Sequence, residues 1–216
     1  MSRRRKWGRI LQSLPLYSSL EDAAEACQQC LACPRAATRQ IVVFGSGNPK
    51  ARLMLVGEAP SSTDDSTGKP FTGPAGRLLD EVLAEAGTHR SDIWITNLVR
   101  CYAGRERDGR TENRPATAKE IAACQTWMST ELQFVNPSVI LAVGAPAARS
   151  IIGSEFRLQK QRGQVQTLPG GRLAIATIQP AYVMRLTTIV DREASAQARE
   201  LLAADVKMAV ELASNN

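Results

Sequence analysis

The sequence predicts a single α/β/α sandwich domain with a central, mostly parallel sheet of four strands. Four short apolar runs have the length and branching of buried strands, and helical patterns lie between them. This alternation favours a parallel sheet that is covered by helices on both faces. The length of 216 residues and the hydrophobic content of 44% suit one compact domain.

Each element can be placed on the chain by its pattern. Strands are expected at the four apolar runs, which span residues 53–56, 93–96, 139–143 and 173–178. Helices are expected where apolar residues recur at helical spacing, at residues 19–33, 76–87, 117–135, 146–153 and 194–213. We assign residues 1–18 to a basic N-terminal arm and residues 19–216 to the α/β domain.

The charge balance favours an anionic partner. The chain has 27 Lys and Arg residues against 21 Asp and Glu residues, so nucleic acid is the first partner to test. It contains no unbroken run of about 18 apolar residues, and we therefore expect a cytoplasmic protein without a membrane partner. The only histidine, His89, excludes multi-histidine zinc sites and most Ser-His-Asp triads. We expect His89 to lie in a surface turn.

The cysteines indicate a metal site. Cys27, Cys30 and Cys33 lie in one short segment, and Cys101 and Cys124 follow far along the chain. Five is an odd number and argues against a simple disulfide framework, whereas CxxC spacing lets two thiolates reach one metal centre. Four thiolates without histidine fit either structural zinc or an iron-sulfur cluster. Buried cysteines without a metal are the alternative, and both CxxC pairs in the first segment remain candidates.

Polar side chains follow three of the predicted strands. Glu58 and Asp65 follow the first strand, Asn97 follows the second and Gln179 follows the fourth. Ligands of open α/β sheets bind beyond the carboxyl ends of the strands. A carboxylate can orient water, a carboxamide can read the edge of a nucleobase, and Phe71 can stack on the base. The alternative is that Glu58 caps a helix, Asn97 satisfies a turn and Phe71 belongs to the core.

Arginines are concentrated in residues 100–114, and Arg162 and Arg185 are candidates for the same surface. Such a loop suits contacts with phosphates, whose strength falls steeply with salt. A solvated charged loop is the alternative, because acidic residues in the same segment offset part of the charge.

A set of segments, in order and spacing, resembles the family 4 uracil-DNA glycosylases, the iron-sulfur branch of the uracil-DNA glycosylase superfamily. The segments are CLACPRAATR, VVFGSGNP, LMLVGEAPSSTDDSTGKPFTGPAGRLLD, IWITNLVRC, ENRPAT, EIAAC, NPSVILAVGAPAARSIIG and QPAYVMR. The resemblance implies a monomeric enzyme of base excision repair at the nucleoid, which flips uracil out of DNA and hydrolyses its N-glycosidic bond.

The resemblance also implies a 4Fe-4S cluster, thought to be structural, with Cys27 as a spare cysteine. Its ligands would be Cys30, Cys33, Cys101 and Cys124. Glu58 would position water and stabilise the sugar cation, and Asp65 would be a second acid of the same loop. The residues implied to bind uracil are Gly57 and Ala59 beside Glu58, Phe71 as the stacking face and Asn97 as the reader of the N3 and O4 edge.

This chain departs from the family pattern at several positions. Gln179 stands where the family has the histidine that donates to uracil O2, and Ser61 replaces a glycine. The segment implied to contact DNA keeps an apolar wedge, and the DNA-binding residues would be Arg162, Tyr182, Val183, Met184 and Arg185. No histidine lies between Cys101 and Cys124, so we expect no histidine adduct with the sugar.

Two other functions stay open at this stage. The neutral Gln179 is also compatible with a protein that binds uracil or modified bases without efficient cleavage. A zinc-stabilised α/β hydrolase or transferase that is unrelated to DNA is the third hypothesis.

Overall fold

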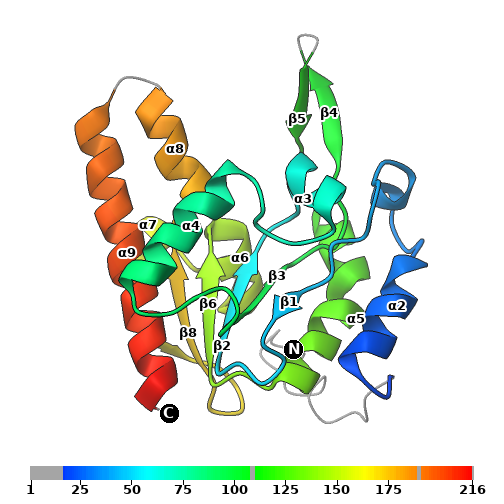
Figure 1. The fold of residues 1–216 in the computed structure, drawn as a ribbon, viewed down its shortest axis with the longest axis horizontal. Helices are drawn as coiled ribbons and strands as arrows, with labels where there is room; N and C mark the ends of the chain where they lie inside the picture. Colours follow the sequence, from blue (N-terminus) through cyan, green and yellow to red (C-terminus); the bar gives the residue numbers. More distant parts are fainter. Residues whose placement is uncertain (1–16, 108–109, 189–190, 216) are drawn as a thin grey trace.

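The computed structural model describes residues 17–107, 110–188 and 191–215, so nearly all of the predicted N-terminal arm lies outside it. The predicted α/β/α architecture is confirmed (Figure 1). The sheet has the strand order β1-β3-β2-β6-β8-β7 and therefore contains six strands, not the expected four. Its centre consists of the four predicted strands, all parallel to their neighbours: β2 (Leu53–Gly57), β3 (Trp94–Asn97), β6 (Val139–Val143) and β8 (Leu173–Thr177).

The two additional strands are short antiparallel edges. They are β1 (Ser46–Gly47), which pairs with β3, and β7 (Gln166–Thr167), which pairs with β8. Each of these strands has only two residues, which are polar or small. Without an apolar run, the sequence pattern does not predict them.

Each face of the sheet packs against its own helices (Figure 1). On one face, the odd-numbered leucines of β2 pack against α4 (Pro74–Glu85), α8 (Pro180–Thr188) and α9 (Arg192–Asn215). On the other face, Met54 and Val56 of the same strand pack against α2 (Leu20–Gln28), α5 (Ala118–Val135) and α6 (Ala145–Ile151). The alternation of strand side chains between two cores requires every residue of β2 to be buried.

Three short elements complete the domain: η1 (Pro34–Ala37), α3 (Ser62–Thr67) and α7 (Leu158–Gln161). The first predicted helix ends earlier than expected, at Gln28, so that Cys30 and Cys33 lie in the turn between α2 and η1. Ser61 is the N-cap of α3, and its hydroxyl accepts a hydrogen bond from the backbone of Asp64. The serine that replaces the family glycine therefore has a structural partner.

The arginine-rich segment forms an antiparallel hairpin that projects from the carboxyl end of the sheet (Figure 1). Its strands are β4 (Gly104–Arg107) and β5 (Arg110–Asn113), and Asp108 and Gly109 between them lie outside the described residues. The expectation of a plain loop is wrong here. The side chains of residues 105–112 also lie outside the description, so the expected phosphate contacts of these arginines stay a prediction.

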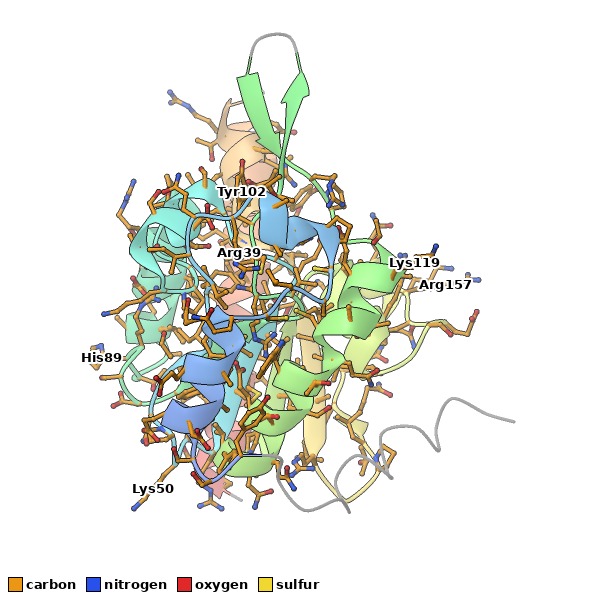
Figure 2. The ribbon with its side chains drawn as sticks, turned by 90° about the vertical axis from the view of Figure 1, so that its right-hand side faces the viewer. Arg39, Lys50, His89, Tyr102, Lys119 and Arg157 are labelled. Atoms are coloured by element: carbon orange, nitrogen blue, oxygen red, sulfur yellow. The ribbon has the colours of Figure 1, made fainter. Side chains whose placement is uncertain are left out.

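Within the described ranges, no helix combines the length and the apolar character that crossing a membrane requires. His89 is exposed in a turn at the margin of the molecule, as expected (Figure 2).

Candidate active site

The carboxyl ends of the parallel strands bring the predicted site residues to one edge of the sheet. Gly57 at the end of β2 is in register with Asn97 at the end of β3. Gly144 and Gln179 follow β6 and β8, whose last residues, Val143 and Thr177, are also in register. The sheet thus gathers groups that are far apart in the chain, as expected for a ligand site of an α/β fold.

The side chains of Asn97 and Phe71 meet over Gly57. A β-carbon at Gly57 would lie 2.4 Å from Asn97 Oδ1 and 2.6 Å from Phe71 Cζ, and neither contact is sterically possible. A glycine at this position therefore lets the carboxamide and the aromatic ring converge. An aromatic face beside a carboxamide has the chemistry that binds a nucleobase.

Phe71 adopts an unfavourable backbone conformation, with φ of 55°. Its carbonyl oxygen accepts a hydrogen bond from Arg90 Nη2 at 2.7 Å. A β-carbon at Gly76 would lie 1.7 Å from the same oxygen, so only glycine leaves room for this loop. Left-handed backbone at a bulky residue persists only where its surroundings fix it, and such residues are concentrated at ligand sites.

Asn97 has an unused hydrogen-bond donor. Its side chain is almost fully buried, with 1% of the residue exposed, and Nδ2 has no hydrogen-bond partner among the described residues. Its backbone carbonyl accepts a hydrogen bond from the guanidinium of Arg100. An unpaired buried donor costs free energy unless a ligand supplies the acceptor. Asn97 is thus prepared for a polar ligand that lies against Phe71.

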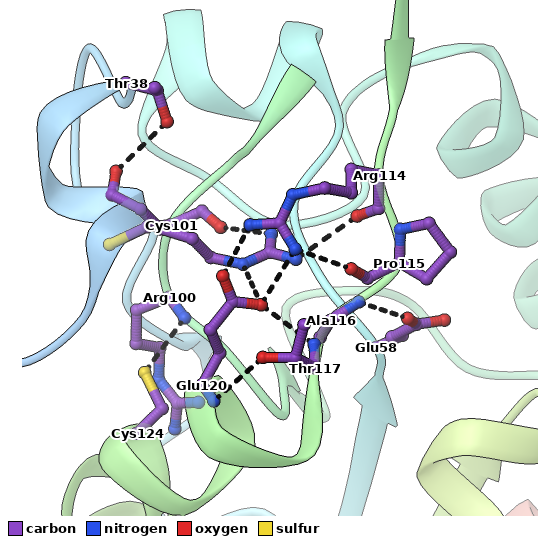
Figure 3. Close-up of polar contacts among 11 residues, drawn as sticks. Thr38, Glu58, Arg100, Cys101, Arg114, Pro115, Ala116, Thr117, Glu120 and Cys124 are labelled. Carbon is purple, nitrogen blue, oxygen red and sulfur yellow. Dashed lines mark hydrogen bonds and ion pairs between the residues drawn. The ribbon is translucent and has the colours of Figure 1, made fainter. Parts of the chain in front are cut away.

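The carboxylate of Glu58 is held on one side only. Its Oε1 accepts a hydrogen bond of 2.8 Å from the backbone N–H of Ala116, which precedes α5 (Figure 3). No hydrogen bond to Oε2 is found in the described part of the chain. The half-buried carboxylate therefore has a fixed orientation and one oxygen available for a water molecule.

Asp65 has a different environment from Glu58. It is buried, with 2% exposed, and its carboxylate accepts hydrogen bonds from the backbone N–H groups of Gln40 (2.9 Å) and Ile41 (3.4 Å). This geometry favours a role in anchoring residues 40–41 over direct contact with a substrate.

Gln179 lies at the same edge with its carboxamide unengaged. Its side chain is half-buried and forms no hydrogen bond with any other described residue. A β-carbon at Gly144 would lie 2.6 Å from Gln179 Cγ and 2.7 Å from its Nε2. The Gln179 amide is thus packed against the backbone that links β6 to α6, where it can donate to a ligand.

The predicted DNA-binding residues separate into two groups. Tyr182, Met184 and Arg185 are exposed on α8, whereas Val183 is only 3% exposed and packs in the core with α4 and α9. The segment forms the helix α8, in which Val183 faces inward, so this side chain is not part of the exposed surface. Arg162 forms an ion pair with Asp205 at 2.8 Å, which favours a structural role.

Three of the expected cysteine ligands accept hydrogen bonds through sulfur. Trp127 Nε1 donates to Cys30 at 3.4 Å, Arg39 donates to Cys101 at 3.6 Å, and the backbone N–H of Arg100 donates to Cys124 at 3.4 Å. Hydrogen bonds to sulfur are typical of iron-sulfur sites, where they stabilise negative charge.

The thiols influence one another. Burial raises the pKa of Cys101 to about 11, and the nearby Cys124 and Cys33 add to this increase. Burial likewise raises the pKa of Cys124, with smaller contributions from Cys33 and Cys30. As placed, the described side chains contain no ready-made group of three or more metal ligands. The four thiols nevertheless fit a metal or an iron-sulfur cluster, because a bound metal ion replaces the thiol protons and pairs with the resulting thiolates.

Two buried ion pairs lie near these cysteines and cannot be read from the sequence. Arg100 contacts Glu131 at 3.0 Å, and Arg35 contacts Glu120 at 3.1 Å. The Thr-x-x-Glu pattern of Thr117 and Glu120 is a capping signal that the sequence contains, and the structure confirms the capping box. The pairing of arginines from distant segments with α5 has no such local signal.

Comparison with known proteins identifies the family. The model of the uracil DNA glycosylase superfamily matches residues 44–203. A type-4 uracil-DNA glycosylase of Thermotoga maritima is 38% identical over 167 residues, which cover 77% of this chain and 83% of that protein. The chain belongs to the type-4 uracil-DNA glycosylases. The resemblance that the motifs indicate is thereby confirmed.

Further relatives agree with this placement. A type-4 uracil-DNA glycosylase of Pyrobaculum aerophilum is 34% identical over 77% of this chain and 85% of its own length. A type-5 uracil-DNA glycosylase of Thermus thermophilus is 32% identical over 62% of this chain and 67% of its own length. The matched superfamily region contains Glu58, Phe71, Asn97 and Gln179 of the type-4 chain.

Proposed function

We propose that this type-4 glycosylase hydrolyses the N-glycosidic bond between uracil and deoxyribose in DNA, as a monofunctional enzyme of base excision repair. The observation that carries the proposal is the meeting of the Phe71 ring and the unpaired Asn97 amide over Gly57, next to the oriented carboxylate of Glu58. Deaminated bases related to uracil are candidate substrates of the same site.

Recognition takes place after the nucleotide leaves the helix. Uracil stacks on Phe71, and the Asn97 carboxamide, with one donor and one acceptor, pairs with the edge that carries O4 and N3. Gly57 and Ala59 line the approach to this position. An unpaired uracil, or one opposite guanine, costs less free energy to flip than a well-paired base.

Bond cleavage separates opposite charges. The sugar becomes cationic and the departing uracil becomes anionic. The Glu58 carboxylate stabilises the first and orients water through the oxygen that Ala116 leaves unengaged. Gln179 donates to the second with its Nε2, in place of the histidine of the family pattern. A neutral amide serves this role without titrating.

The cofactor is proposed to be a 4Fe-4S cluster that is held by Cys30, Cys33, Cys101 and Cys124, with Cys27 outside the ligand set. When bound, the cluster links three segments of the chain and gives the fold stability rather than reaction chemistry. The hydrogen bonds to three of these sulfurs support this assignment over unligated cysteines.

Cysteine variants test the ligand set. Cys101→Ala should lose the broad visible absorbance and the iron, whereas the matched variant Cys27→Ala should keep both. Full iron content in Cys101→Ala would overturn the ligand set, and zinc in place of iron in the wild type would overturn the cluster.

DNA is the proposed partner, single-stranded or double-stranded, and the protein is proposed to act as a monomer at the nucleoid. Tyr182, Met184 and Arg185 on α8 form one side of the contact, and the β4–β5 hairpin is on the same end of the sheet (Figure 1). The net charge of +6 supports contact with phosphates.

Replacement of the carboxylate tests the role of Glu58. Glu58→Gln keeps the size of the side chain and should bind uracil-containing DNA while its excision falls to a slow residual rate. Glu200→Gln, at an exposed position of α9, is the matched control and should excise like the wild type. Equal excision by Glu58→Gln would overturn the proposed role.

A second candidate function follows from the neutral Gln179. In this alternative, the protein binds uracil or a modified base in DNA without efficient cleavage. Tight, salt-sensitive binding without excision by the wild type, and a large gain of excision in Gln179→His, would support the alternative and contradict the enzyme.

A further inference from the structure

An ion-pair bridge of the buried Arg35 and Glu120 with the partly exposed Arg114 connects the cysteine-bearing segments with the position of Glu58 (Figure 3). At its centre is Glu120, in the first turn of α5, which is 4% exposed. Its Oε2 lies 3.1 Å from Arg35 Nε and 3.1 Å from Arg114 Nη1, and its Oε1 contacts Arg114 Nη2. The same carboxylate caps α5 by accepting the Thr117 N–H at 2.8 Å.

Arg35 connects this centre to two other segments. The guanidinium is 1% exposed, and it donates to the carbonyl oxygen of Cys101 at 3.0 Å and to that of Arg114 at 3.2 Å. Because Arg35 follows Cys33 by two residues, one side chain joins the first cysteine segment, the segment after β3 and the segment that enters α5.

The segment from Arg114 to Thr117 is therefore fixed at both ends. Arg35 holds the carbonyl of Arg114, and Glu120 holds the N–H of Thr117. Between them lies Ala116, whose N–H donates to Glu58 Oε1 at 2.8 Å. The direction of this single donor decides which oxygen of Glu58 is engaged and which remains for water.

We infer that Arg35, Glu120 and Arg114 are positioning residues for Glu58, which they hold through the Ala116 amide. The inference rests on the proposed function, because Glu58 has a reaction to perform only there. Buried charges are costly unless they are paired, and breaking such a pair displaces the segments that it joins. A misplacement of about 1 Å at a reacting group can cost about 100-fold in rate.

The inference assigns the cysteine-bearing segments a second role. Arg35 is two residues from Cys33 and contacts the Cys101 carbonyl. The fixed positions of these segments therefore help to fix the water-orienting carboxylate of Glu58, although none of the bridge residues touches substrate. The bridge makes the geometry of the site depend on segments that are distant from it in the sequence.

The test combines Glu120→Gln with Glu58→Gln in a double-mutant cycle. The control is Lys119→Gln, at the exposed neighbouring position, which lies at the margin of the molecule (Figure 2). Excision is measured in single turnover, beside the dissociation constant for uracil-containing DNA and the iron content. Glu120→Gln should slow excision by about 10- to 100-fold while DNA affinity and iron content stay near the wild-type values, and Lys119→Gln should change none of the three.

The double variant distinguishes positioning from general damage. If Glu120 acts through Glu58, adding Glu120→Gln to Glu58→Gln should cause no further loss, since the group that it positions is already disabled. Losses that multiply in the double variant, or full excision by Glu120→Gln, would overturn the inference.

A second variant covers the case in which Glu120→Gln folds poorly. Arg114→Lys keeps the charge but cannot form the bidentate contact, and it should show the same slow excision with unchanged DNA affinity. Full excision by Arg114→Lys would contradict the inference. If Glu58→Gln excises uracil as fast as the wild type, the result contradicts the proposed role of Glu58 instead. The two failures are therefore distinguishable.

Discussion

The carboxamide of Gln179 packs directly against the α-carbon of Gly144. The space in which a side chain of Gly144 would begin is filled by the Cγ and Nε2 atoms of Gln179. Gly144 also has a φ of 88°, which favours glycine. The position of Gln179, which replaces the histidine of the family pattern, therefore depends on the glycine that follows another strand, β6.

Gly144→Ala should displace Gln179 and slow uracil excision, because the added methyl group overlaps the carboxamide. Gly170→Ala is a matched control, since Gly170 has the same φ of 88° but nothing within 4 Å of an added β-carbon. The single-turnover rates of the two variants are compared with that of the wild type. Equal rates in both variants would show that Gln179 does not need its observed position.

Gln179→Ala removes the amide that is proposed to donate a hydrogen bond to the departing uracil anion. Losing one such donor costs about 3 kcal/mol, or about 100-fold in rate. The effect should fall on the chemical step and leave DNA affinity nearly unchanged. An unchanged single-turnover rate in Gln179→Ala would assign the stabilisation of the leaving group to another residue.

Glu131 is predicted to be essential for stability. Its carboxylate is fully buried and contacts Arg100, Trp94 Nε1 and the Gly45 N–H. Glu131→Leu would leave the Arg100 guanidinium buried without its partner, which costs about 3–5 kcal/mol. Urea unfolding at neutral pH measures the loss. A free energy of unfolding within about 1 kcal/mol of the wild-type value, the range of exposed ion pairs, would contradict this prediction.

The Glu120 bridge should make stability depend on acid pH. Hydrogen bonds from Arg114 lower the pKa of Glu120 to about 2, with smaller contributions from the Thr117 N–H and Arg35. Because this folded-state pKa is below the ordinary value of 4.5, the stabilisation is complete above that value and is lost as the pH falls toward 2. Its size is on the order of 3 kcal/mol.

Comparison of the wild type with Glu120→Gln isolates this contribution. Their difference in the free energy of unfolding should be constant above pH 5 and should shrink as the pH falls from about 4.5 toward 3. A difference that does not change with pH would mean that Glu120 has an ordinary pKa in the folded protein.

The sheet and much of the site are predictable from local pattern. Buried strands such as β6 are continuously apolar because helices cover both faces, and Asn97 and Gln179 can be placed because they end or follow such strands. The inward direction of the Val183 side chain does not follow from the QPAYVMR motif. In a helix, the same residue turns toward the core.

The remaining features depend on contacts between distant segments. Ala116 and Glu58 are 58 positions apart, and nothing near either residue predicts their hydrogen bond. The same holds for Arg35, which as an isolated arginine is expected at the surface but is buried between three segments. The hairpin strands, Gly104–Arg107 and Arg110–Asn113, are polar in sequence, so no hydrophobic alternation marks them.

Uracil excision is measured directly as release of uracil from oligonucleotides by the wild-type protein, with its iron content verified. Single-stranded and guanine-opposed uracil substrates are compared with thymine and cytosine substrates of the same sequence. We expect alkali-labile sites at uracil only, and no covalent adduct on a denaturing gel. Intact uracil strands after prolonged incubation with the iron-containing protein would contradict this expectation.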